Sequence, residues 1–237
     1  MRIKTNGRRR GGLVLGLVAL LAALVLTLPA GAQEPERFDE KVRELFFAGF
    51  AGNEDALQRG MAICEETLAA EPDHPGALAW QASGWFFQSG TAFTQGDWET
   101  GMALFEKSLA QFDHAVTLAP DSLETRIPRA ATLLSAAPYV THAPTRNEFL
   151  EKVVGDYTKA LELQKSYFDS LTVHSRGELL GALASALWLL ERRVEAQIYL
   201  SRIIADLPNS PYALMAQQQL DNPATPAQLT CLGCHKY

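Results

Sequence analysis

The stretch AQIYLSRIIADLP, residues 196–208, carries the pattern that decides the fold. Ala196, Leu200 and Ile203 follow one another at spacings of four and three residues, which places them on one face of a helix. Pro208 then ends the helix, because its ring clashes with the preceding turn and it lacks an amide hydrogen. The stretch therefore predicts a helix that presents a small, a larger and a medium-sized apolar residue to a neighbour.

The same arrangement precedes two other prolines, Pro72 and Pro120. The corresponding residues are Gly60, Cys64 and Thr67 in the first case and Ser108, Phe112 and Ala115 in the second. Small residues let two helices touch, and the larger residue fills the groove between them. This pattern resembles the second helix of a tetratricopeptide repeat. The resemblance implies an all-α, tetratricopeptide-like helical-hairpin stack over residues 33–220, with about four irregular pairs and a terminal helix.

Two features depart from the pattern of that family. The third pair, about 122–168, ends in Tyr167-Phe168-Asp169 and lacks the closing proline. The interval from Pro72 to Pro120 is 48 residues, longer than the family's repeat of about 34 residues. A helical bundle without repeats, with the same residues in its core, is the alternative.

Helical periodicity runs through the body of the chain, with no convincing strand. The first helix is expected over 38–50, and Gly49 lies on its apolar stripe, where it would let a neighbouring helix approach closely. The second helix is expected to begin after the N-cap Asn53 and to stop at Pro72. The remaining helices are expected at about 75–91, 97–118, 122–137, 146–168, 175–191, 194–206 and 210–220.

Residues 1–32 have the order of a secretory signal peptide. The basic segment 1–12 is followed by the apolar run Leu13–Leu28 and by Ala30-Gly31-Ala32, an A-x-A site that predicts cleavage after Ala32. The alternative is an uncleaved signal anchor, since about 20 apolar residues can cross a bilayer. The arginines at 8–10 resemble a twin-arginine signal, but their neighbours favour the general secretory route. The expected location is periplasmic or extracytoplasmic, with membrane anchoring if the leader stays attached.

The chain is acidic, with 21 Lys+Arg against 27 Asp+Glu and a formal net charge of -6. Five of the basic residues and none of the acidic ones lie in the leader, so its cleavage leaves 16 basic groups and a net charge of -11. Nucleic-acid binders need a basic footprint, so this charge argues against that class. It favours a basic protein partner. Three cysteines are also too few for a small domain built on disulfides.

The C-terminal segment, residues 221–237, is predicted to be a linker with prolines followed by a haem-binding tail. The tail contains Cys231-Leu232-Gly233-Cys234-His235. C-x-x-C-H is the attachment signature of c-type haem, so the tail resembles that of a c-type cytochrome. The resemblance implies one covalently attached haem c, tethered by Cys231 and Cys234, with His235 as the proximal iron ligand.

Three other interpretations of these residues stay open. Cys231 and Cys234 could form a redox dithiol, although no βαβ thioredoxin pattern surrounds them. They could bind zinc together with His235, although a structural zinc takes a fourth ligand and none is nearby in sequence. They could also form an inert disulfide across a short loop.

Only two residues follow His235, so a distal iron ligand has to come from upstream or from another chain. The leading candidates are Met215, the nearest in sequence, and His142, in a segment expected to be a loop. The other candidates are His74, His114 and His174. The choice matters because the axial ligand sets the reduction potential over a wide range. Cys64, at a repeat position, is expected to be a buried and inert thiol.

Aromatic residues concentrate in one unit of the predicted stack. They are Trp80, Trp85, Phe86, Phe87, Phe93 and Trp98. At helical spacing such a cluster is typical of a core, and a partner or ligand groove is the alternative.

The expected function is electron transfer by an exported monohaem c-type cytochrome-like protein, whose helical body docks to a protein redox partner or a membrane complex. One alternative is a periplasmic scaffold or transport-accessory binding protein without a redox role. Another is a haem enzyme or gas sensor with an open iron site. The sequence contains no catalytic triad order, metalloprotease helix or phosphate loop, which favours a carrier or binding protein over a catalyst.

Overall fold

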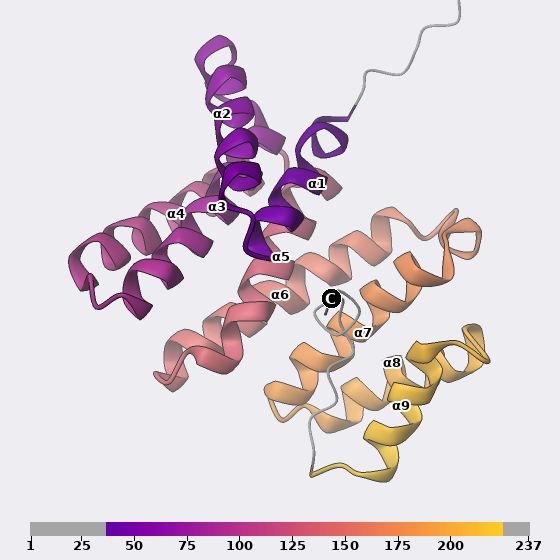
Figure 1. The fold of residues 1–237 in the computed structure, drawn as a ribbon. Coiled ribbons are helices and arrows are strands. Elements are labelled where there is room, and N and C mark those ends of the chain that lie inside the picture. Colours follow the sequence, from indigo (N-terminus) through magenta and orange to yellow (C-terminus); the bar gives the residue numbers. More distant parts are fainter. Residues whose placement is uncertain (1–36, 225–237) are drawn as a thin grey trace, which may run out of the picture. The chain divides into compact units, whose positions relative to one another are not determined.

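Nine α-helices and two short 3-10 helices make up residues 37–224, the part of the chain that the computed structural model describes (Figure 1). No strand occurs among these residues. The α-helices are α1 Phe38–Phe50, α2 Glu54–Ala70, α3 Pro75–Thr94, α4 Trp98–Leu118, α5 Leu123–Ala136, α6 Ala143–Leu163, α7 Val173–Leu189, α8 Arg193–Asp206 and α9 Pro211–Asp221. The 3-10 helices are η1 Ala137–Tyr139 and η2 Phe168–Ser170. The predicted all-α class is confirmed.

The helices pack as four successive hairpins and a final helix. The hairpins are α1–α2, α3–α4, α5–α6 and α7–α8, and α9 packs against α8. The second helix of each hairpin also contacts the first helix of the next, and the first helices contact one another along the series. Each hairpin therefore buries its apolar face against its neighbours, which is how a stacked helical-hairpin protein builds a continuous core.

The repeat positions that the sequence singled out lie inside these contacts. Eight of the nine residues are buried, and Thr67 is half-buried with its hydroxyl donating to the carbonyl oxygen of Ile63 at 2.8 Å. In α2, α4 and α8 they lie ten, six and three residues before the last helical residue. The same positions in α6 are Val153, Tyr157 and Ala160, all of them buried. The third pair thus keeps the pattern although it lacks the proline.

The boundaries of α6 and α7 differ from the prediction. Helix α6 begins at Ala143, three residues earlier than expected, because Pro144 lies in its first turn, where proline is well tolerated. It ends at Leu163, and Phe168 belongs to η2. Helix α7 ends at Leu189 because Glu191 adopts a left-handed backbone conformation, with φ of 62°.

Gly49 provides the close approach between α1 and α2 that its position predicted. A Cβ atom built on Gly49 would lie 2.7 Å from the Cβ and 3.0 Å from the Cα of Leu57. Leu57 is itself buried, and its backbone belongs to α2. The two helices therefore touch at a point where no side chain fits between them.

Replacing Gly49 by alanine is expected to destabilise the protein by about 1–3 kcal/mol, because α2 has to shift away to make room for the methyl group. Urea unfolding followed by far-UV circular dichroism measures this change. Gly155→Ala is the matched control, because a Cβ there meets nothing within 4 Å and lies on an exposed face of α6. That control is expected to gain about 0.5–1 kcal/mol from helix propensity. Equal effects of the two changes would contradict the proposed contact.

A buried ion-pair network joins the second and third hairpins. The Asp156 carboxylate on α6 is only 1% exposed and accepts hydrogen bonds from Arg126 at 2.6 Å and from Arg129 at 2.7 and 2.8 Å. Arg129 also donates to Asp113 on α4 at 2.7 Å. Burial alone would lower the pKa of Arg129, but its hydrogen bonds and attraction to Asp156 and Asp113 outweigh burial and raise that pKa above its ordinary value. The network connects α4, α5 and α6 at one point.

Candidate functional site

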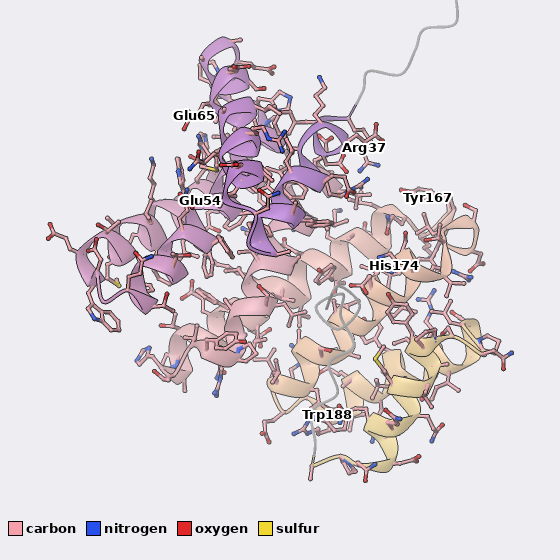
Figure 2. The ribbon with its side chains drawn as sticks, in the orientation of Figure 1. Arg37, Glu54, Glu65, Tyr167, His174 and Trp188 are labelled. Carbon is pink, nitrogen blue, oxygen red and sulfur yellow. The ribbon has the colours of Figure 1, made fainter. Side chains whose placement is uncertain are left out.

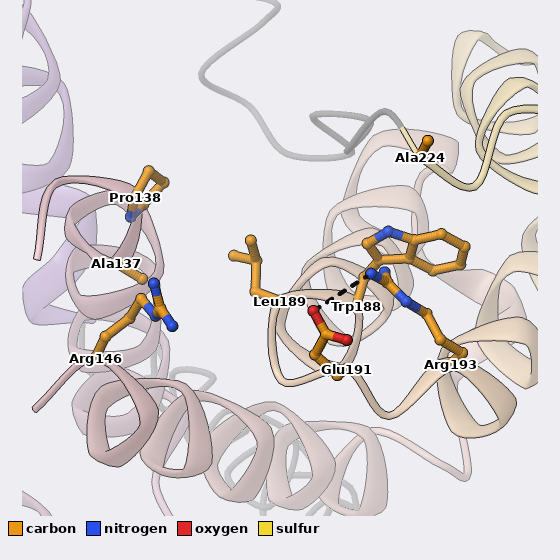
Figure 3. A pocket seen from close by; sticks show the side chains of 8 residues that line it. All are labelled: Ala137, Pro138, Arg146, Trp188, Leu189, Glu191, Arg193 and Ala224. Carbon is orange, nitrogen blue, oxygen red and sulfur yellow. Dashed lines mark ion pairs between the residues drawn. The ribbon is translucent and has the colours of Figure 1, made fainter. Parts of the chain in front are cut away.

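A pocket opens beside Ala224, the last described residue before the tail that contains the C-x-x-C-H sequence (Figure 3). Its volume is about 320 Å³. The lining residues come from η1, the start of α6, the end of α7 and the turn into α8, and they are Ala137, Pro138, Arg146, Trp188, Leu189, Glu191, Arg193 and Ala224. The pocket therefore lies where the third and fourth hairpins meet. Volumes of about 300–1,000 Å³ are usual for small-molecule sites, so this pocket suits a small ligand or one arm of a larger one.

Two arginines of the pocket have buried nitrogen atoms without hydrogen-bond partners. They are Nε of Arg146 and Nη1 of Arg193, for which the described part of the chain supplies no acceptor. Leaving a buried donor unsatisfied costs about 1–3 kcal/mol, and more for a charged group. The two guanidinium groups of the lining nevertheless favour an anion in the pocket, because carboxylates and phosphates accept strong hydrogen bonds from guanidinium groups. The site is therefore suited to a negatively charged ligand.

The rest of the pocket orients Arg193. Its guanidinium lies over the ring of Trp188, 4.1 Å from the centroid, and its Nη2 is 3.8 Å from Oε1 of Glu191 (Figure 3). In Figure 2, His174 marks the beginning of α7 and Trp188 marks its end. The indole holds the guanidinium by a cation–π interaction and leaves its edge available for hydrogen bonds. Glu191 offsets one of the two positive charges, so the pocket keeps a net positive charge.

Glu191 also marks backbone strain at this pocket. Its amide donates to the carbonyl oxygen of Trp188 at 3.1 Å, and the amide of Arg192 donates to the carbonyl oxygen of Leu187 at 2.9 Å. This is the hydrogen-bond pattern of a Schellman C-cap. Glycine is the usual residue at the left-handed position of that motif, because a side chain there costs roughly 1–2 kcal/mol. Glu191 therefore ends α7 at one wall of the pocket.

The tail residues that the sequence predicted to bind haem are Cys231 and Cys234, as tethers, and His235, as iron ligand, and all three lie outside the described residues. The predicted signal peptide, residues 1–32, lies outside them as well. The two distal-ligand candidates are described and differ in availability. His142 is exposed, and its Nδ1 lies 2.9 Å from the hydroxyl of Thr145. Met215 is half-buried on α9, packed against the core of the third and fourth hairpins.

His142 is the better placed of the two candidates. It is the residue immediately before α6, and its carbonyl oxygen accepts the amide of Arg146 at 3.0 Å. One helical turn, about 5.4 Å along the axis, therefore separates His142 from an arginine of the pocket. No hydrogen bond of the described residues engages its Nε2, so this nitrogen can act as a ligand.

The other three histidines have structural partners. Nδ1 of His74 accepts the amide of Ala77 at 3.1 Å and thereby caps α3. Nε2 of His114 lies 3.8 Å from Asp73, and Nδ1 of His174 lies 2.9 Å from the hydroxyl of Tyr212. We therefore do not assign iron ligation to these three.

Cys64 is fully buried, as expected from its repeat position. Burial, with a smaller contribution from the charge of Glu65, raises the pKa of its thiol to about 12. A thiol with this pKa stays protonated at neutral pH and is a poor nucleophile and metal ligand. The predicted burial of Cys64 is confirmed, and the raised pKa of its thiol agrees with the predicted inert role.

The aromatic cluster is divided between core and surface. Trp80 is buried, Trp85, Phe86, Phe87 and Phe93 are half-buried, and Trp98 is 67% exposed. Most of the cluster therefore packs within the stack, as predicted, while Trp98 leaves an apolar ring on the surface at the start of α4.

Comparison of the chain with protein-family models, curated proteins and solved structures finds no match. Within residues 37–224, no group of three or more His, Cys, Asp or Glu side chains is arranged to hold a metal ion. In the same part of the chain, no helix combines the length and the apolar character needed to span a bilayer.

Sequence reasoning missed the pocket residues Arg146, Trp188 and Arg193. Forty-two residues separate Arg146 from Trp188 in the chain, so no local motif connects them. Glu191 gave no local signal either, because the sequence placed it at the end of the helix expected over 175–191, and its left-handed backbone is known only from the structure.

Proposed function

We propose that the protein is an exported, monohaem c-type cytochrome-like electron carrier whose tetratricopeptide-like body docks to a protein redox partner or a membrane complex. The observation that carries the proposal is the sequence Cys231-Leu232-Gly233-Cys234-His235, within seven to eleven residues of the end of the described body. Its two thiols and imidazole are the donor set that a covalent haem c requires. When bound, the haem supplies one-electron transfer at its iron.

The residues of this chain hold and orient that group. In this proposal Cys231 and Cys234 would tether the haem, and His235 would bind its iron. His142 would be the second iron ligand, because it is exposed and its Nε2 is available, whereas Met215 packs against the core. The acidic body steers the carrier to a basic partner.

Exposed apolar side chains on α8 support docking of the body to a protein. Val194 is 74% exposed and Ile198, one turn further along, is 62% exposed, so the two lie on the same face of the helix. Leu214 on α9 is 62% exposed as well. These residues also favour the second candidate function, a periplasmic scaffold or transport-accessory binding protein without a redox role. That candidate requires partner binding to survive removal of residues 225–237.

Expression of the full chain with a haem-attachment system, followed by pyridine haemochrome spectroscopy, tests the proposal. We expect a c-type spectrum with one haem per chain that persists after denaturation, because thioether bonds are covalent. A colourless protein with two reactive thiols would contradict it. Addition of carbon monoxide to the reduced protein then separates a carrier from an open-site enzyme or sensor, since an iron with two protein ligands resists this gas.

A further inference from the structure

We propose that the pocket lined by Arg146 and Arg193 binds the propionate carboxylates of the haem carried on the tail. This inference rests on the proposed function and assigns a docking site within the same chain. It makes Arg146 and Arg193 positioning residues for the cofactor, a role distinct from that of the tethering cysteines.

The first argument is charge and hydrogen-bond chemistry. The pocket contributes two guanidinium groups and one carboxylate, a net positive charge in a chain with a formal net charge of -6. Each guanidinium has a buried nitrogen atom that finds no acceptor among residues 37–224. The propionates of a haem are carboxylates, and carboxylates in the pocket would form charge-assisted hydrogen bonds with the guanidinium groups that line it.

The second argument is reach. Seven residues separate Ala224, which lines the pocket, from Cys231. A chain of seven residues spans at most about 24 Å when extended, and its root-mean-square length as a flexible linker is about 15 Å. A ligand tethered at that distance has an effective concentration in the millimolar range, so weak contacts suffice to hold it.

The third argument is the position of His142 one helical turn before Arg146. The amide of Arg146 donates to the carbonyl oxygen of His142, so the first turn of α6 presents both an anion-binding side chain and a candidate iron ligand. Carboxylate binding at Arg146 and iron ligation at His142 would therefore act on the same cofactor and reinforce one another.

The test compares the holoprotein with Arg146→Gln, Arg193→Gln and the double variant, with Arg59→Gln as the control. Arg59 is an exposed residue of α2 in the first hairpin, and its substitution removes the same charge. The first measurement is the rate at which proteinase K releases the haem peptide from the body. We expect the double variant to release it about tenfold faster, which corresponds to 1.4 kcal/mol of lost docking free energy.

The second measurement is the reduction potential. Positive charge near the haem stabilises the ferrous form, which carries one more negative charge than the ferric form. The potential of the double variant is therefore expected to fall, and that of Arg59→Gln to stay at the wild-type value. Replacement of both arginines by lysine keeps the positive charge and is therefore expected to keep the reduction potential near the wild-type value. The same variant is expected to regain less protection from protease, because lysine cannot bind a carboxylate in bidentate fashion.

The outcomes separate the two proposals. Absence of haem from the wild-type chain overturns both of them. A covalent haem whose release rate and reduction potential are equal in all variants overturns only the docking site. This result is expected if the pocket binds a free carboxylate or phosphate and not the haem. If the double variant unfolds, the wild-type protein alone tests the docking site. Salt screens the attraction between carboxylates and arginines, so added salt is then expected to speed release of the haem peptide from the wild type. A release rate that does not change with salt would overturn the docking site.

Discussion

Replacing Asp156 by alanine is expected to lower the free energy of unfolding by about 3–5 kcal/mol, the cost of breaking a buried ion pair by removing one partner. The carboxylate is 1% exposed and accepts three hydrogen bonds from Arg126 and Arg129. Without it, Arg129 keeps its charge in a buried position with Asp113 as its remaining partner. The loss of stability is large because a buried charge is costly unless an opposite charge and hydrogen bonds compensate for its lost hydration.

Urea unfolding of the full chain, followed by far-UV circular dichroism, measures the change. The matched control is Asp121→Ala, which removes an ion pair with Lys159 at 2.9 Å whose carboxylate is 70% exposed. Solvent screens such a pair, so the urea midpoint of Asp121→Ala is expected to stay close to that of the wild type. A midpoint for Asp156→Ala that matches the control would show that the network does not hold the second and third hairpins together.

Replacing Cys231 and Cys234 together by alanine is expected to abolish covalent haem attachment completely. Each thiol forms one thioether in the proposed function, and no other pair of cysteines exists in the chain. The measurement is haem-stained gel electrophoresis under denaturing conditions, which detects only covalently bound haem. The fold should persist, because both residues lie beyond α9, the last helix of the described residues.

Cys64→Ala is the control for this experiment. Its thiol is buried with a pKa of about 12, so it stays protonated and plays no part in attachment. We expect the control to keep a full complement of haem and to lose some stability through the small cavity it leaves. Retention of haem by the double variant, or its loss in the control, would contradict the assignment of Cys231 and Cys234.

The helices could be predicted because their signals are local. Apolar spacing, N-caps and closing prolines act within a few residues. Asn53 caps the start of α2, and Pro208 follows the end of α8, both where the sequence predicted. The start of α6 was predicted too late because Pro144 acted as a first-turn residue and not as a loop residue. Local signals of this kind leave the exact helix end uncertain by a few residues.

The candidate site could be predicted only in part. C-x-x-C-H is recognisable because haem attachment requires its donors at adjacent positions of one chain segment. The difference in exposure between His142 and Met215, on which we base the proposal of His142, needed the structure, because it depends on which side chain the core covers. The arginine pocket needed it as well, because Arg146 and Arg193 come from two different hairpins.

The sequence by itself determined the all-α class, the number of hairpins and the acidic charge, since each depends on composition or on residues a few positions apart. The haem tether is a prediction of the same local kind. The tertiary structure alone decided which charges are buried together and which polar atoms remain unsatisfied. Asp156 meets Arg129 only after α5 and α6 pack, and Arg146 meets the end of α7 only where the third and fourth hairpins stack. Burial and long-range contact arise from chain packing, and packing brings together residues that no local pattern connects.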